Sequence, residues 1–295
     1  MRILVSGATG LIGGALVSAL EKDRHDVTVL SRSEAVQAPR LLWDPERGKI
    51  DARLLDGFNA VVHLAGESIA KGRWTPLMKE RIRESRCRGT GLLAQTVAAV
   101  PRPPQVFVCA SAIGFYGDRG DEVLTEDSPA GTGFLADVCR EWESACRPAA
   151  ARGIRVVHAR FGVVVSRRGG ALKKMIRPFQ WGLGGKIGSG RQWWSWIGLR
   201  DVVGAIQQIL KDGSLSGPVN VTAPAPVRND EFSRMLGRVL RRPAVTPLPA
   251  FVAKLIFGEM ADALLLASAR VEPKKLIQSG YVFHAPTLVQ ALTEA

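Results

Sequence analysis

Cysteine is scarce in this chain of 295 residues, which has only Cys87, Cys109, Cys139 and Cys146. No two of them form a C-x-x-C pair, and none stands near a histidine at zinc-finger spacing. These absences exclude a disulfide scaffold and a structural zinc as the basis of the fold. We therefore predict no metal site, and we expect the reducing cytoplasm as the compartment.

Acidic side chains are outnumbered: 27 Asp and Glu stand against 40 Lys and Arg, which gives a net charge of +13. The arginines are scattered along the chain and form no run of five or six. A nucleic-acid binder usually concentrates its charge on one element. We therefore favour an arginine-rich soluble enzyme, with no nucleic-acid and no membrane partner. A nucleic-acid or anionic-lipid surface is the less favoured alternative.

Long hydrophobic runs are also few. The one stretch near the length of a membrane span, residues 3–20, carries no charge and follows Arg2. It contains glycines at positions 7, 10, 13 and 14, whose spacing suits a turn. We predict strand, turn and helix here, and no membrane segment.

Buried strand patterns alternate with helical patterns over the first half of the chain. Strands are predicted at 2–6, 27–30, 60–64, 106–110 and 154–158, and helices at 11–22, 75–99 and 133–152. Such alternation predicts an α/β fold, a Rossmann-type doubly wound parallel sheet, over residues 1–165. Residues 166–295 are predicted to form a smaller C-terminal α+β substrate lobe, with a helical extension from about 247.

The first βα turn carries the strongest motif, Gly7-Ala-Thr-Gly10-Leu-Ile-Gly13. The first glycine permits a tight turn, the second lets the backbone approach a pyrophosphate, and the third lets the helix pack on the sheet. The helix N-terminus then offers free N–H groups to phosphate. The residues predicted to bind the dinucleotide here are Gly7, Thr9, Gly10, Leu11, Ile12 and Gly13.

The end of the second strand indicates which dinucleotide binds. An acid at this place would hold the 2′-hydroxyl of NAD, but the chain has Ser31 and Arg32 instead. A hydroxyl and a guanidinium suit a 2′-phosphate. We therefore predict NADP(H) in preference to NAD(H).

A second wall of the cofactor site is predicted at Leu64, Ala65, Gly66 and Glu67, where small residues allow close approach. The preceding His63 is interpreted as a buried structural imidazole rather than a catalytic group. Arg86 lies on the inward face of the helix at 75–99 and needs an anionic partner. That partner is either a phosphate of the cofactor or a carboxylate. The alternative is an ordinary ion pair with Glu67 or Glu84.

The combination of motifs resembles the extended short-chain dehydrogenase/reductase superfamily. It is carried by the glycine motif, by His63-Leu-Ala-Gly66, by Gly89-Thr90, by Ser111 to Gly117 and by Arg200-Asp201-Val202-Val203. The segments 66–74, 134–140, 188–193 and 258–262 are similar to its epimerase-like branch, the NAD-dependent epimerase/dehydratase family. The stretch from about Pro247 resembles that branch's small helical extension.

Tyrosine is scarcer still, and this affects the chemistry that the resemblance implies. The superfamily uses a Y-x-x-x-K pair, but Gly120 follows Tyr116 by four residues and Ala285 follows Tyr281. Placing Glu143 in register with the superfamily's downstream glutamate puts Leu135 at the tyrosine position and Cys139 at the lysine position. The usual hydroxyl position holds Ala112.

Two residues remain as catalytic candidates, Ser111 and Tyr116. Ser111 follows a predicted strand and therefore lies at the sheet edge where ligands bind, so we also count it among the cofactor-site residues. Tyr116 could donate a proton if its phenol reaches the substrate. For both, the alternative is a residue of the pocket wall or of a loop.

The substrate is expected against Arg160, Arg191 and Trp194, whose charges and aromatic face suit an anionic or nucleotide-bearing ligand. Because Trp193, Trp194 and Trp196 cannot all point one way, one or two should belong to the core.

Two function hypotheses follow. The first is an NADP(H)-dependent oxidoreductase or epimerase-like enzyme for a small carbonyl, alcohol or nucleotide-linked substrate. The second is a non-catalytic NADP(H)-binding sensor or scaffold. The resemblance also implies a possible homodimer through the helices at 75–99 and 133–152.

Overall fold

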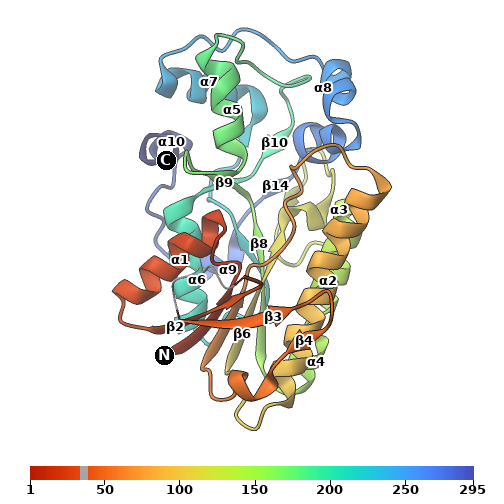
Figure 1. The fold of residues 1–295 in the computed structure, drawn as a ribbon. Coiled ribbons are helices and arrows are strands. Elements are labelled where there is room, and N and C mark those ends of the chain that lie inside the picture. The colour runs from red at the N-terminus through yellow and green to blue at the C-terminus, as the bar shows by residue number, and fades with distance from the viewer. Residues whose placement is uncertain (34–38) are drawn as a thin grey trace.

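The computed structural model describes residues 1–33 and 39–295. Its body is an eight-stranded sheet in the order β12-β8-β6-β5-β1-β2-β3-β4, with a smaller lobe at one end (Figure 1). Neighbouring strands are parallel except β3 and β4. The Rossmann-type α/β prediction is therefore confirmed.

The strands of the main sheet are β1 (Arg2–Ser6), β2 (Asp26–Ser31), β3 (Arg40–Asp44), β4 (Lys49–Ile50), β5 (Ala60–His63), β6 (Val106–Ala112), β8 (Arg155–Phe161) and β12 (Gly217–Val221). Shorter pairs join β7 (Val123–Leu124) to β14 (Arg270–Val271), β9 (Val163–Val165) to β11 (Trp196–Gly198), and β10 (Trp193–Trp194) to β13 (Val227–Arg228).

The helices of the sheet layers are α1 (Leu11–Lys22), α2 (Pro76–Ala99), α3 (Phe134–Ser144), α4 (Arg147–Ala151) and α6 (Leu199–Lys211). The lobe carries α5 (Gly170–Gln180), α7 (Asn229–Leu240), α8 (Ala250–Phe257), α9 (Lys274–Gln278) and α10 (Leu288–Glu294). Short turns of other helix types are η1 (Ala52–Leu55), η2 (Ile113–Tyr116) and η3 (Ala261–Leu266).

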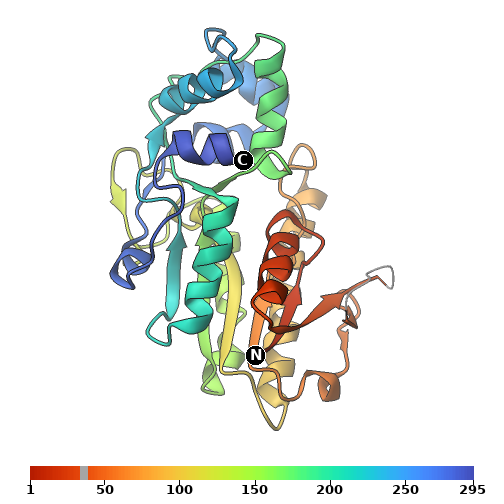
Figure 2. The ribbon, with the colours of Figure 1, turned by 90° about the vertical axis from the view of Figure 1, so that its left-hand side faces the viewer.

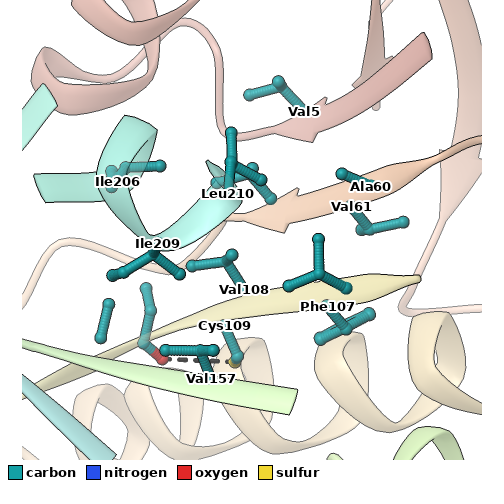
Figure 3. Close-up of a cluster of buried hydrophobic side chains, with 14 of the residues drawn as sticks. Val5, Ala60, Val61, Phe107, Val108, Cys109, Val157, Ile206, Ile209 and Leu210 are labelled. Atoms are coloured by element: carbon teal, nitrogen blue, oxygen red, sulfur yellow. Dashed lines mark hydrogen bonds between the residues drawn. The ribbon is translucent and has the colours of Figure 1, made fainter. Parts of the chain in front are cut away.

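Burial of apolar strands between two helical layers stabilises the body. The inner strands β1, β5 and β6 are almost continuously apolar and buried, as expected for a parallel sheet covered on both faces. Helices α1 and α6 cover one face, and α2 with α4 covers the other (Figure 2). Figure 3 shows Ile206, Ile209 and Leu210 of α6 directed at the sheet.

Strand β1 lies at the point where the chain reverses its direction across the sheet. It pairs with β2 on one side and with β5 on the other. The connections after β1 and β5 lead to helices on opposite faces of the sheet, α1 and α2. We call the region outside the carboxyl ends of β1, β2 and β5 the cofactor crevice. Ligands of open α/β sheets bind at this kind of position.

Several predicted elements differ from those observed. The single helix predicted at 133–152 is interrupted at Ala145–Cys146, just before Pro148, and forms α3 and α4. Strand β3 and helix α5 were not predicted. The residues of β3, which lies near the sheet edge, show no clear alternation of apolar and polar side chains. Helix α5 contains Pro178, which argues against a helix.

The predicted boundary at residue 165 needs a correction. Helix α6 and strand β12 follow it in sequence but belong to the sheet and its covering layer. The chain thus leaves the body after β9, builds part of the lobe and returns. The reason is that β12 buries its apolar residues only by pairing with β8.

The N-terminal apolar stretch at 3–20 forms β1, the glycine turn and most of α1. Within residues 1–33 and 39–295, no helix is long and apolar enough to cross a bilayer.

Candidate functional site

The turn after β1 and the start of α1 have no room for a side chain at Gly7 or at Gly13. Gly7 has φ +74°, and a Cβ there would lie 2.7 Å from the Leu64 carbonyl. A Cβ on Gly13 would lie 2.2 Å from the Gly7 oxygen. Glycine is therefore required at both positions, and it lets α1 begin close to the end of β5.

Helix α1 begins at this turn with its first N–H groups available. Its N-cap is Gly10, and no described side chain caps it. Thr9 and Gly10 are exposed, and Leu11 and Ile12 are half-buried. An uncapped helix start with a positive dipole end binds anions such as a diphosphate. Contact of these residues with the diphosphate stays a prediction.

Ser31 and Arg32 lie at the end of β2, on the other side of the cofactor crevice. The Ser31 hydroxyl donates to the Ser33 carbonyl at 2.9 Å and accepts from the Ser33 amide at 3.0 Å. The Arg32 side chain is 68% exposed and lies 4.0 Å from a Glu46 oxygen. Such a weakly held guanidinium can turn towards a phosphate.

The loop after β5 is anchored by a buried pair of polar side chains. The Ser6 hydroxyl lies 2.6 Å from His63 Nδ1 and accepts from the amides of Leu64 and Ala65. Burial lowers the pKa of His63 to about 4, so the ring is neutral. Trp43 packs edge-on against the same ring. This supports the structural interpretation of His63.

This buried imidazole predicts a pH dependence of stability. Its folded pKa lies below that of an unfolded histidine, so its contribution is fully present above about pH 6.5 and decreases as the pH falls towards 4. Between pH 7.5 and pH 5 the expected loss is about 2 kcal/mol, at ~1.4 kcal/mol for each pH unit below about 6.5. Chemical denaturation at pH 7.5 and pH 5 should show this loss in the wild type and a clearly smaller one in His63→Gln. The exposed His284→Gln is the control, and an equal loss in all three proteins contradicts the prediction.

Arg86 lies against the second wall of the crevice. Its Nη1 donates to the carbonyls of Glu67 and Ile82, at 3.0 and 3.1 Å, and its guanidinium lies over the Trp142 ring. A Cβ on Gly66 would touch it at 3.5 Å. Burial lowers the pKa of Arg86 relative to an exposed guanidinium.

The ion pair considered for Arg86 is not formed among the described residues. The Glu67 carboxylate binds Lys71 at 2.6 Å, and this hydrogen bond lowers the pKa of Glu67. Glu84 is exposed. A guanidinium without a carboxylate partner thus lines the crevice, where a phosphate or substrate carboxylate would neutralise it.

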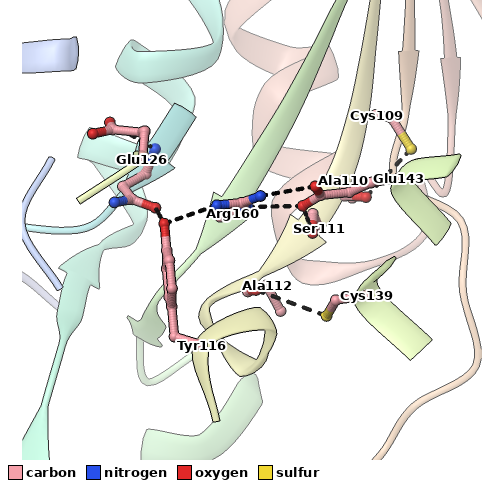
Figure 4. A network of polar contacts seen from close by, with 10 residues as sticks. Cys109, Ala110, Ser111, Ala112, Tyr116, Glu126, Cys139, Glu143 and Arg160 are labelled. Carbon is pink, nitrogen blue, oxygen red and sulfur yellow. Dashed lines mark hydrogen bonds and ion pairs between the residues drawn. The ribbon is translucent and has the colours of Figure 1, made fainter. Parts of the chain in front are cut away.

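A buried polar network starts at Ser111, at the carboxyl end of β6 (Figure 4). The Ser111 hydroxyl donates to Glu143 Oε1 at 2.7 Å. Arg160 of β8 binds both oxygens of Glu143, at 2.8 and 2.9 Å. Burial works to lower the pKa of Arg160, but the hydrogen bonds and charge of Glu143 outweigh it and raise that pKa.

Tyr116 joins the same network from the inside of the protein. It is fully buried, donates to Asn220 Oδ1 at 2.7 Å and accepts from Arg160 Nη1 at 2.9 Å. Burial raises the pKa of its phenol. The expected proton donation by Tyr116 therefore needs revision, because its proton is already given to Asn220 and no surface of it is open to a substrate.

Arg160 needs the same revision. It is 3% exposed, and its guanidinium also stacks over the Phe115 ring at 3.5 Å. Its guanidinium already donates to Glu143 and Tyr116. It is therefore not available for the direct substrate contact that the sequence suggested.

The positions aligned with the superfamily's tyrosine and lysine face the Ser111 region from α3. Leu135 packs on Gly114, and the Cys139 thiol lies 3.8 Å from the Ala112 carbonyl. Burial raises the pKa of Cys139 to about 11, so this thiol stays protonated at neutral pH. Neither side chain can supply a phenol or an ammonium group.

The residues expected on the substrate side are spread between surface and core. Arg191 is exposed, whereas Trp194 is 6% exposed and packs edge-on against Phe232. Trp196 is also buried, which confirms that two of the three tryptophans belong to the core. Trp194 therefore offers no aromatic face, and the expected contact needs correction.

Trp193 is the half-buried aromatic residue of this segment. Its ring lies between the guanidiniums of Arg228 and Arg270, at 4.6 and 4.7 Å from the ring centre, and its Nε1 donates to Asp121. This stack is the cationic and aromatic surface that the tryptophan-rich segment supplies.

The sequence did not reveal the roles of Glu143 and Asn220. Glu143 lies 32 residues after Ser111, and Asn220 lies 104 residues after Tyr116. No local spacing signals such contacts, and only the sheet order brings β6, β8 and β12 side by side. In the described ranges, no histidine, cysteine and carboxylate group is arranged to hold a metal ion.

Fold and site together define a Rossmann-type protein of the extended short-chain dehydrogenase/reductase kind. The model of the NAD dependent epimerase/dehydratase family matches residues 3–222, and a domain of unknown function, DUF1731, matches residues 248–295. The chain belongs to the NAD-dependent epimerase/dehydratase family.

Named relatives match this chain over nearly its full length. An epimerase family protein of Mycobacterium bovis is 43% identical, over 98% of this chain and 96% of its own. The crystal structure of human epimerase family protein SDR39U1 with NADPH is 36% identical, with a TM-score of 0.92, and covers 100% of this chain and 98% of that one. A nucleoside-diphosphate sugar epimerase from Corynebacterium glutamicum is 36% identical, with a TM-score of 0.82 over 58% of its chain.

Proposed function

We propose that this protein is an NADP(H)-dependent oxidoreductase or epimerase-like enzyme that acts on a small carbonyl, alcohol or nucleotide-linked substrate. The observation that carries the proposal is the Ser111 hydroxyl, held 2.7 Å from Glu143 at the sheet edge where the cofactor crevice opens. We also propose the cytoplasm as its compartment, supported by four free cysteines. A homodimer through α2 and the segment 133–152, which forms α3 and α4, remains a prediction.

The choice of NADP(H) is supported by three features. The cradle of Gly7, Gly10 and Gly13 fits a diphosphate. Ser31 and Arg32 end β2, where an acid would favour NAD. The relative SDR39U1, 36% identical to this chain, was crystallised with NADPH.

The bound dinucleotide would supply or accept the hydride, and the chain's own residues would handle the proton. Ser111 is 2% exposed, so a substrate hydroxyl must approach it from the carboxyl end of β6, where its oxygen retains a lone pair with which to accept a hydrogen bond. In the oxidation direction, Ser111 takes that proton while its own proton passes to Glu143 Oε1. In the reduction direction, the same two transfers run backwards.

The other network residues position this pair. Arg160 holds both Glu143 oxygens and keeps the carboxylate oriented towards Ser111. Tyr116 accepts a hydrogen bond from Arg160, and Asn220 in turn accepts one from Tyr116. A relay through Glu143 replaces the proton function that Leu135 and Cys139 cannot provide.

The proposal is tested with Ser111→Ala on a panel of carbonyl and alcohol substrates, with NADPH oxidation or NADP reduction as the readout. We expect kcat to fall by ~10²-fold or more, while the variant stays folded by circular dichroism and still binds NADPH. The neighbouring exposed Ser144→Ala is the control and should be as active as the wild type. Unchanged turnover in Ser111→Ala would reject the relay.

The alternative function is a non-catalytic NADP(H)-binding sensor or scaffold, and it is favoured by the leucine and cysteine at the superfamily's tyrosine and lysine positions. Tight NADPH binding by wild-type protein with no turnover of any panel substrate in either direction would support this alternative.

A further inference from the structure

The far end of the lobe combines exposed apolar side chains with a cluster of arginines. We define the distal basic patch as Trp181, Leu183, Val245, Arg234, Arg238, Arg241 and Arg242. We propose that this patch docks on a membrane surface that contains anionic phospholipid. The proposal departs from the expectation of no membrane partner, because the fold gathers these arginines in one groove beside exposed apolar side chains. It is independent of the chemistry at Ser111.

The patch is assembled where α5 and α7 end, at the end of the molecule far from the N-terminus (Figure 1). Arg241 ends α7 in the left-handed region, with φ +53°, and turns the chain back along the helix. The returning segment packs closely on Gly237, where a Cβ would lie 2.8 Å from the Arg242 oxygen. Thr246 then donates to the carbonyls of Gly182 and Gly184, which places Val245 beside the loop after α5.

The arginines of the patch line one groove of about 510 Å³ together with Val245. Arg234 is paired with Asp230 at 3.0 Å. In residues 1–33 and 39–295, the side chains of Arg238, Arg241 and Arg242 have no hydrogen-bond or ion-pair partner. The patch therefore carries an uncompensated positive charge, which attracts the phosphates of an anionic lipid layer.

The apolar members are among the most exposed large side chains of the protein. Val245 is 77% exposed, Trp181 73% and Leu183 60%. A tryptophan between apolar and charged neighbours suits the boundary between lipid headgroups and acyl chains. Insertion of these three side chains would remove their apolar surface from water while the arginines stay at headgroup level.

Two other occupants fit the same surface less well. A second copy of the chain, paired through this patch about a twofold axis, would bring the two sets of arginines together. A nucleic acid would use the arginines, but its phosphate backbone offers nothing to bury Leu183 and Val245 against. The combination of charge and aliphatic exposure favours lipid.

The test is vesicle co-sedimentation of the full chain, with equimolar phosphatidylglycerol and phosphatidylcholine or with phosphatidylcholine alone. We expect binding only to the anionic vesicles, with weakening at high salt. Arg238→Glu/Arg241→Glu should reduce the binding by ~10-fold or more, and Trp181→Ser/Leu183→Ser by ~10-fold. The control Arg81→Glu/Arg88→Glu changes the charge equally, on exposed positions of α2.

The control pair should bind the vesicles almost as the wild type does. The proposal is overturned if the wild type ignores anionic vesicles, if the control loses as much binding as the patch variant, or if the apolar variant binds unchanged. Patch-dependent binding to a DNA duplex without vesicle binding, or patch-dependent dimerisation without it, would overturn it as well. Circular dichroism of each variant establishes that it is folded.

Discussion

Gly13→Ala is expected to reduce NADPH affinity by at least ~100-fold, which corresponds to about 2.7 kcal/mol. The added methyl would lie 2.2 Å from the Gly7 carbonyl oxygen, a backbone atom that no rotamer change can move. Helix α1 must therefore shift away from the turn. Its uncapped N-terminus, which provides the N–H groups for the diphosphate, moves with it. NADPH fluorescence on titration with protein measures the loss.

Two further variants separate the causes of this loss. Gly91→Ala in α2 adds the same methyl into open space, and it should leave the affinity unchanged and raise stability by about 0.5–1 kcal/mol. Arg32→Ala should lower NADPH affinity by ~10-fold and leave NADH affinity unaltered, because it removes only the partner of the 2′-phosphate. Wild-type affinity in Gly13→Ala would show that the turn does not hold the dinucleotide.

Glu143→Leu is expected to destabilise the protein by about 3–5 kcal/mol, because it leaves the Arg160 guanidinium buried without its carboxylate. The side chains of Arg160 and Glu143 are only 4% and 12% exposed, so solvent cannot replace the lost partner. Ser111 also loses its acceptor. The free energy of unfolding from urea denaturation is the measurement.

A matched change on the same helix provides the comparison. Glu141→Leu on α3 removes the partner of Arg83 in an ion pair whose side chains are 40% and 47% exposed, and it should cost about 1 kcal/mol or less. The double variant Glu143→Leu/Arg160→Met should recover part of the stability, since it removes both charges. If Glu143→Leu and Glu141→Leu lower the free energy of unfolding equally, the prediction that the buried Glu143–Arg160 pair matters more than an exposed pair is wrong.

Much of the cofactor crevice was accessible from the sequence because its signals are local. The glycines at 7, 10 and 13 lie within one turn, and the strand before them and the helix after them have clear periodicities. Ser31 and Arg32 follow a buried strand at a fixed distance in sequence. These residues meet because the two strands are neighbours in the sheet.

The buried polar network around Ser111 was not accessible in the same way. Ser111, Glu143, Arg160 and Asn220 come from three strands and a helix, far apart in sequence. Tyr116 was expected to face a ligand, yet it points inward because Asn220 and Arg160 satisfy its hydroxyl there. Trp194 lies in the core, where its ring packs edge-on against Phe232.

The sequence by itself determined the parallel α/β body and the glycine turn at which we propose that the dinucleotide binds, since strand burial, helix periodicity and turn glycines act between near neighbours. Only the tertiary structure decided which polar groups pair in the interior and which charges stay unpaired on the lobe. Those outcomes depend on desolvation, and a side chain's access to water is set by every element that packs around it.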